Sequence, residues 1–121
     1  GGVRIGTAEI YRSIENFEEV IDSVVVGKPE ESDVSIVLCL KLSDELGLSK
    51  ELEEKIRYQI RKSTTARHVP KYIFQVTDIP YTISGKKVEK AVLHSILGKK
   101  IKNKDALINP ESLAEYAKLT F

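Results

Sequence analysis

The chain has 121 residues, of which 41% are hydrophobic and 31% are charged. This length supports one domain with a core of its own, and the composition argues against intrinsic disorder. The only cysteine is Cys39, so an internal disulfide is excluded and a reducing, cytoplasmic compartment is expected. No apolar run reaches the ~20 residues of a membrane span and no signal peptide is visible, while the absence of methionine suggests a piece of a longer protein.

Charge is unevenly distributed along the chain, although the formal net charge is only +1. Thirteen acidic and four basic residues between Glu9 and Glu54 give −9, whereas thirteen basic and two acidic residues between Lys55 and Lys104 give +11. A basic half favours an anionic partner, because clustered charge attracts charge of the opposite sign. A solvated lysine-rich face is the alternative interpretation of the same pattern.

The first part of the chain predicts one helix and two strands. Residues 7–14 combine a threonine cap with apolar positions at helical spacing, so we expect a short helix there. The β-branched run 24–27 predicts a strand that stops at its glycine and at the proline two residues later, and the acidic segment 30–33 predicts a loop. Residues 34–40 are apolar at nearly every position, which predicts a strand covered on both faces, with Cys39 in the core.

The middle of the chain predicts a helix, a loop and a third strand. Ser49 is placed to cap a helix that runs to about residue 62, with one apolar row at four-residue spacing. Residues 63–71 follow as a loop, and residues 72–76 have the composition of a strand.

The last part of the chain predicts a loop over residues 80–87, a helix that Gly98 terminates, and a terminal helix over residues 109–118. In that terminal helix we expect Asn109 to be the cap and Pro110 to take the first helical position. The predicted fold class is therefore α+β, with a small three-stranded sheet packed against amphipathic helices.

Most catalytic motifs are absent from this sequence. Cys39, His68 and His94 are single and far apart, so no metal site is expected, and neither a G-x-S-x-G motif nor a Walker loop occurs. We expect His94 to be a partly exposed packing residue on its helix, and His68 to make a hydrogen bond within a turn. A self-contained enzyme is therefore not expected.

Three elements are candidates for ligand chemistry. The glycine-rich start at residues 1–7, with Gly2 and Arg4, leads into a helix whose free N–H groups suit a phosphate, although such starts are also linkers. Arg61 has no acidic neighbour at helical spacing, so its charge is available, although a solvated arginine at a helix end is the simpler interpretation. Lys86 follows a glycine turn just before a helix and can neutralise charge on a carboxylate or phosphate, or be an ordinary turn lysine.

Taken in chain order, these elements resemble the mobile C-terminal domain of the adenylate-forming acyl-CoA synthetases. GVRIGTAEI at residues 2–10 is similar to the segment after that family's interdomain hinge, and IPYTISGK at residues 79–86 is similar to its catalytic-lysine loop. The segments at residues 66–73 and 101–113 resemble the acetoacetate-activating branch of the family.

The resemblance implies a role for each candidate residue. Lys86 matches the family's lysine that reaches the acyl carboxylate and the nucleotide. Arg4 matches an arginine near the nucleotide phosphates. Gly2 matches a glycine at the coenzyme A channel, and Arg61 matches an arginine near the coenzyme A phosphate. The residue after Pro80 is a tyrosine where many acetyl-CoA synthetases carry a basic residue, which argues against acetate as the acid.

The same resemblance implies the setting in which these residues act. Residues 1–121 would be one lid domain of a larger enzyme, with residues 100–121 as a C-terminal extension. An N-terminal adenylating domain of the same chain would hold most of the active centre, so that this fragment alone would be inactive. The implied substrates are an acid, ATP with Mg²⁺, and coenzyme A, with no membrane or nucleic acid as partner.

Two other function classes remain open at this level. A nucleic-acid-binding module would use the basic half, although Tyr72 and Phe74 are the only closely spaced aromatic residues and no RNA-recognition or helix-turn-helix signature occurs. A protein-docking domain without a catalytic role would tolerate substitution of Lys86 in the full-length chain.

Overall fold

The computed structural model describes residues 7–31, 33–43, 46–102 and 104–121. Its elements comprise helices, strands and three short 3₁₀ turns, which follow one another as α1 (Thr7–Ile14), β1 (Val20–Glu30), β2 (Asp33–Leu42), α2 (Lys50–Ser63), η1 (Ala66–His68), β3 (Tyr72–Gln75), α3 (Glu89–Ile96), η2 (Lys104–Ala106), η3 (Pro110–Ser112) and α4 (Leu113–Ala117). None of the helices in this described part is long and apolar enough to cross a membrane.

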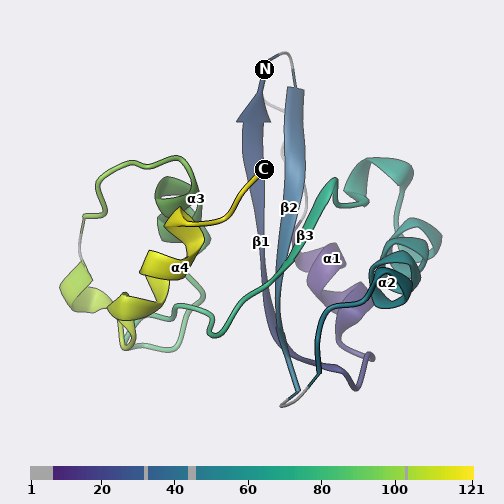
Figure 1. Ribbon diagram of the computed structural model, residues 1–121, viewed down its shortest axis with the longest axis horizontal. Coiled ribbons are helices and arrows are strands. Elements are labelled where there is room, and N and C mark those ends of the chain that lie inside the picture. The colour runs from purple at the N-terminus through teal and green to yellow at the C-terminus, as the bar shows by residue number, and fades with distance from the viewer. Residues whose placement is uncertain (1–6, 32, 44–45, 103) are drawn as a thin grey trace.

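The strands form one mixed sheet in the order β1-β2-β3, with β1 antiparallel and β3 parallel to the central β2. Helices α1 and α2 cover one face of this sheet, and α3 and α4 cover the other (Figure 1). Residues 36–40 of β2 are all buried, so the prediction of a strand covered on both faces is confirmed. The predicted α+β class is confirmed with it.

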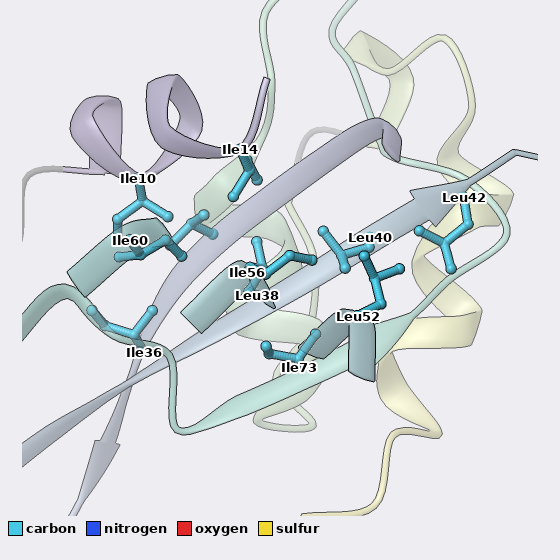
Figure 2. Close-up of a cluster of buried hydrophobic side chains, with 11 residues drawn as sticks. Ile10, Ile14, Ile36, Leu38, Leu40, Leu42, Leu52, Ile56, Ile60 and Ile73 are labelled. Atoms are coloured by element: carbon cyan, nitrogen blue, oxygen red, sulfur yellow. The ribbon is translucent and has the colours of Figure 1, made fainter. Parts of the chain in front are cut away.

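The first core lies between the sheet and helices α1 and α2. Ser49 caps α2, because its hydroxyl accepts a hydrogen bond of 3.1 Å from the backbone N–H of Leu52. From that start, helical spacing places Leu52, Ile56 and Ile60 in one buried row. Figure 2 shows this row packed on side chains of β2 and of α1, among them Ile10. The predicted helices over residues 7–14 and 49–62 are therefore confirmed.

The second core lies between the sheet and α3, α4 and the turns around them. Val24 and Val26 of β1 pack here together with Cys39 of β2, Val92 of α3 and Tyr116 of α4. Burial raises the pKa of the Cys39 thiol to about 12, so this thiol stays protonated at neutral pH, as expected for a core cysteine.

Strand β1 is longer than the sequence pattern predicts, because Gly27 and Pro29 lie inside it. A proline is tolerated at an edge strand, and Pro29 faces Val34 near the end of the β1–β2 ladder. A Cβ at position 27 would lie 2.8 Å from a methyl group of Val34, so glycine permits the close approach of the two strands. The predicted loop over residues 30–33 is also corrected, because Glu30 and Asp33 are paired strand ends.

The C-terminal helix begins later than predicted. Pro110 does take the first helical position, but it opens the 3₁₀ turn η3, and the α-helical part is the short α4. The Asn109 side chain makes no capping hydrogen bond. Instead it accepts from the backbone N–H of Tyr81 at 3.1 Å and donates to the Asp78 carboxylate at 2.8 Å and the Ile79 carbonyl at 2.9 Å. The cap prediction is wrong because these distant partners occupy the amide.

Candidate functional site

Lys86 lies on a tight hairpin over residues 81–87, which the local sequence specifies. Tyr81 and Lys87 form an antiparallel bridge, and the backbone N–H of Thr82 donates to the Lys86 carbonyl at 2.8 Å. The hydroxyl of Thr82 in turn accepts from the backbone N–H of Lys86 at 3.0 Å. Gly85 adopts a φ of +87°, a conformation that favours glycine. The backbone of Lys86 is therefore held on both sides by Thr82, so the stem of its side chain starts from a defined position.

Lys86 and Lys87 are neighbours with opposite environments. The Lys87 ammonium pairs with the Asp22 carboxylate at 3.3 Å and lies 4.0 Å from the centre of the Tyr11 ring. Lys86 is exposed, and within the described part of the chain its side chain has no ion pair and no hydrogen bond. Its charge is therefore available to a ligand or to another part of a longer chain, whereas the charge of Lys87 is already used.

The first arm of the hairpin is anchored through Tyr81. Its hydroxyl donates to the other oxygen of Asp22 at 2.6 Å. Burial and this hydrogen bond both raise the pKa of Tyr81, so the phenol remains a donor at neutral pH. Backbone hydrogen bonds between Ile83 and Ala106 and between Ile108 and Tyr81, both of 2.9 Å, join the hairpin to the C-terminal segment.

Arg61 lies in the last turn of α2, on the opposite face of the sheet from the Lys86 hairpin (Figure 1). Arg57, one turn earlier, pairs with Glu53 four residues before it at 3.6 Å and also donates to the Pro70 carbonyl at 3.1 Å. Arg61 is exposed, and no carboxylate of a described residue lies within ion-pair distance of it. The structure therefore keeps Lys86 and Arg61 apart, one on each side of the sheet.

Gly2 and Arg4, the two other predicted site residues, lie outside the described residues. The helix that follows them, α1, covers the same face of the sheet as α2.

The charge asymmetry of the sequence is partly neutralised in the fold. Among the described residues, most of the ion pairs join the acidic half to the basic half, including Asp22 with Lys87, and Glu30 with Lys71 at 3.0 Å. His68 lies 3.5 Å from Glu9 and is hydrogen bonded to the Thr65 hydroxyl at 2.8 Å, which confirms the predicted turn hydrogen bond. Within the described residues, no three His, Cys, Asp or Glu side chains lie together as metal ligands would.

The sequence interpretation missed Tyr11, Asp22 and Glu89. Tyr11 accepts from the backbone N–H of Val25 at 2.9 Å and donates to Glu89 at 2.8 Å, so it joins α1 to β1 and to the first turn of α3. The only signal available in the sequence was Asp22 itself, a charged residue two positions before the apolar run of residues 24–26. Its partners Tyr81 and Lys87 are far away along the chain and could not be identified from spacing.

Comparisons with known proteins identify a family and several relatives of this chain. The profile of the AMP-binding enzyme C-terminal domain family matches residues 10–86, and therefore extends to Lys86. An acetoacetyl-coenzyme A synthetase of Rhizobium meliloti is 46% identical over 98% of this chain, and an acetoacetyl-CoA synthetase of Xenopus tropicalis is 47% identical over 95% of it. The chain spans only 18% and 17% of these two relatives.

The solved structure of an acetoacetyl-CoA synthetase from Streptomyces lividans superimposes with a TM-score of 0.84 at 30% identity, over 94% of this chain and 18% of that one. The likeness to these relatives extends past residue 86 into the C-terminal segment, which the family profile does not reach. The family match favours the interpretation as part of an adenylate-forming enzyme over that as a nucleic-acid-binding module. With most of its length matched by the profile, the chain belongs to the AMP-binding enzyme C-terminal domain family.

Proposed function

We propose that the chain is the C-terminal domain of an ATP-dependent acid–CoA ligase, and that the acid is acetoacetate. The choice of acid rests on the relatives named above, which are acetoacetyl-CoA synthetases. The catalytic part of the proposal rests on one observation, namely that the hairpin leaves the Lys86 side chain exposed while the ammonium of its neighbour Lys87 is paired with Asp22. Because the chain spans under a fifth of its relatives, most of the active centre belongs to an N-terminal adenylating domain of the same chain.

In the first half-reaction, a carboxylate oxygen of the acid attacks the α-phosphate of ATP. The new bond joins the acyl group to AMP, and the bond to pyrophosphate breaks. Two anions have to approach each other for this attack, so a cation placed between them lowers the barrier. Lys86 supplies that cation. Magnesium enters with ATP as part of the substrate, and the metal ligands that position it belong to the N-terminal domain.

In the second half-reaction, the thiol of coenzyme A attacks the acyl carbonyl and AMP leaves. We propose that the domain rotates on its hinge between the two steps, which withdraws Lys86 and presents the face that carries Arg61. The placement of Lys86 and Arg61 on opposite faces of the sheet supports this alternation, since a rotation is required before the second residue can replace the first. In this scheme Arg61 binds a coenzyme A phosphate, Gly2 lines the channel for its thiol arm, and Arg4 lies near the nucleotide phosphates.

Two finer features complete the proposal. We place residues 1–121 in one lid domain, with residues 100–121 as an extension that contributes Leu107, Leu113 and Tyr116 to the second core. We place the enzyme in the cytoplasm, where the single buried thiol of Cys39 needs no oxidising partner.

The test uses Lys86→Ala and Arg61→Ala in the full-length enzyme, with the two half-reactions measured separately. Lys86→Ala should slow acyl-adenylate formation by about 10²–10³-fold, the usual effect of losing one preorganised charge donor, and should spare thioester formation from supplied acyl-adenylate. Arg61→Ala should do the reverse, raising KM for coenzyme A and sparing adenylation. The matched controls are Lys90→Ala and Lys62→Ala, two exposed lysines near these sites. Equal losses in both half-reactions for Lys86→Ala would contradict the proposed division of roles.

A further inference from the structure

Asp22 lies on β1 where the ladder with β2 is irregular. The register shifts between Val20 and Asp22, so Ile21 has no partner on β2 and is 56% exposed. Such bulges re-aim the side chains beside them. Asp22 faces the second core, on the same side of β1 as Val24, and its side chain is 25% exposed. A carboxylate in this half-buried place requires hydrogen-bond or ionic partners.

Both oxygens of Asp22 are used by the hairpin that carries Lys86. Oδ2 accepts from the Tyr81 hydroxyl at 2.6 Å, and Oδ1 pairs with the Lys87 ammonium at 3.3 Å. Oδ1 also accepts from the backbone N–H of Ser23 at 2.8 Å, which fixes the carboxylate on its own strand. Tyr81 and Lys87 are the two residues that pair across the base of the hairpin. One carboxylate therefore holds both arms of the hairpin against β1.

The contacts of Lys87 extend this anchor to α1 and α3. Its ammonium lies over the Tyr11 ring at 4.0 Å, an attractive geometry for a cation and an aromatic face. The hydroxyl of Tyr11 donates to Glu89 in the first turn of α3 and accepts from the backbone of β1. Side-chain contacts thus connect the base of the hairpin to β1, α1 and α3.

The hairpin does not depend on Asp22 for its own formation. Its turn is closed by backbone hydrogen bonds between Thr82 and the residues 85 and 86. Its first arm is joined by backbone hydrogen bonds to the last residue of η2 and to Ile108 just after it, and Asn109 accepts from the backbone of Tyr81. Removing the Asp22 carboxylate should therefore leave the hairpin folded but free to shift relative to the sheet.

We propose that Asp22 is a positioning residue for Lys86, holding the hairpin at the place on the sheet from which the lysine reaches the reacting phosphate. This inference rests on the proposed function. Asp22 touches neither substrate nor the Lys86 side chain, and acts through Tyr81 and Lys87. A displacement of only 1 Å in a positioned group can cost ~10²-fold in rate, so a small shift of the hairpin is enough to impair adenylation.

The experiment compares Asp22→Asn, Lys86→Ala and the double variant in the full-length enzyme. Asp22→Asn should lower kcat for acyl-adenylate formation by about 10–10²-fold while leaving thioester formation from supplied acyl-adenylate unchanged. In the Lys86→Ala background it should have no further effect, because there is no ammonium left to position. Asp33→Asn, an exposed acid at the far end of the same strand pair, is the matched control.

Three results would overturn the inference: wild-type adenylation in Asp22→Asn, an equal loss in both half-reactions, or additive losses in the double variant. Thermal unfolding of each variant checks that the domain is folded. If Asp22→Asn does not fold, Tyr81→Phe removes one of the two contacts at nearly constant volume and should show the same selective loss, to a smaller degree. If Lys86→Ala itself leaves adenylation intact, the proposed function fails, whereas a normal Asp22→Asn beside an impaired Lys86→Ala refutes only the role of Asp22.

Discussion

The two faces of the sheet are held by different kinds of interaction. On the face covered by α1 and α2, aliphatic side chains at helical spacing pack on alternate residues of the strands, as Figure 2 shows. On the other face, α3 is accompanied by the short helix α4 and the turns η2 and η3, and no helix there is as long as α2. There, polar side chains supply the order: the Tyr116 hydroxyl donates to the Asp78 carbonyl at 2.7 Å, and Asn109 joins Asp78 to Tyr81.

This difference shows that regular apolar packing and specific polar contacts have different structural roles in this chain. The first face needs only the right apolar volume at the right spacing, which many sequences satisfy. The second face must hold an irregular hairpin in one place, and directional hydrogen bonds between distant residues do this better than apolar contacts. The proposed catalytic lysine lies on the face that is held in this directional way.

The largest expected effect comes from truncating one fully buried side chain on each face of the sheet. Tyr116→Ala should lower the free energy of unfolding by about 3–5 kcal/mol and Ile60→Ala by about 2–5 kcal/mol, since both side chains are fully buried. Tyr116→Phe isolates the hydrogen bond to Asp78 and should cost about 1 kcal/mol. Urea unfolding measures all three. A Tyr116→Phe variant as stable as the wild type would show that the second face does not depend on its polar contacts.

The next effect compares one polar residue from each face. Asn109→Ala leaves the backbone N–H of Tyr81 and the carboxylate of Asp78 short of a partner and should cost about 1–3 kcal/mol. Ser49→Ala removes the cap of α2 and should cost about 1 kcal/mol. The same unfolding measurement applies, with the exposed Glu54→Gln as control. A greater loss for Ser49→Ala than for Asn109→Ala would reverse the comparison.

The smallest effect concerns a solvent-accessible carboxylate at the end of β1. Hydrogen bonds from Ser35, Lys71 and Tyr72 lower the pKa of Glu30 to about 2. Because the pKa is lower in the folded state, the stabilisation is complete above the ordinary value of 4.5 and is lost as the pH falls towards 2. Glu30→Gln should therefore make the free energy of unfolding less dependent on pH between pH 4.5 and pH 2. Thermal unfolding at stepped pH measures this, and an unchanged slope would contradict the assignment.

Local patterns determined much of this structure. Helical spacing and a serine cap predicted α2, and the wholly apolar run of β2 predicted its burial on both faces, because these features depend on residues within about four positions of one another. The Gly85 turn likewise placed Lys86 on a loop ahead of a helix. For the same reason Arg61 could be recognised as lacking a partner along its own helix.

Only the tertiary structure decided how the hairpin is held and which lysine keeps its charge free. The local sequence does not show that Lys87 is paired and Lys86 free, since that difference arises from Asp22 and Tyr11, which approach Lys87 from β1 and α1. Tyr81 and Asp22 are 59 positions apart, and Tyr11 and Glu89 are 78 apart. Asn109 was likewise expected to cap a helix, but its side chain is hydrogen bonded to Tyr81 and Asp78, which are 28 and 31 positions away. Spacing along the chain encodes contacts within one element, whereas contacts between elements exist only once the sheet brings their side chains into reach.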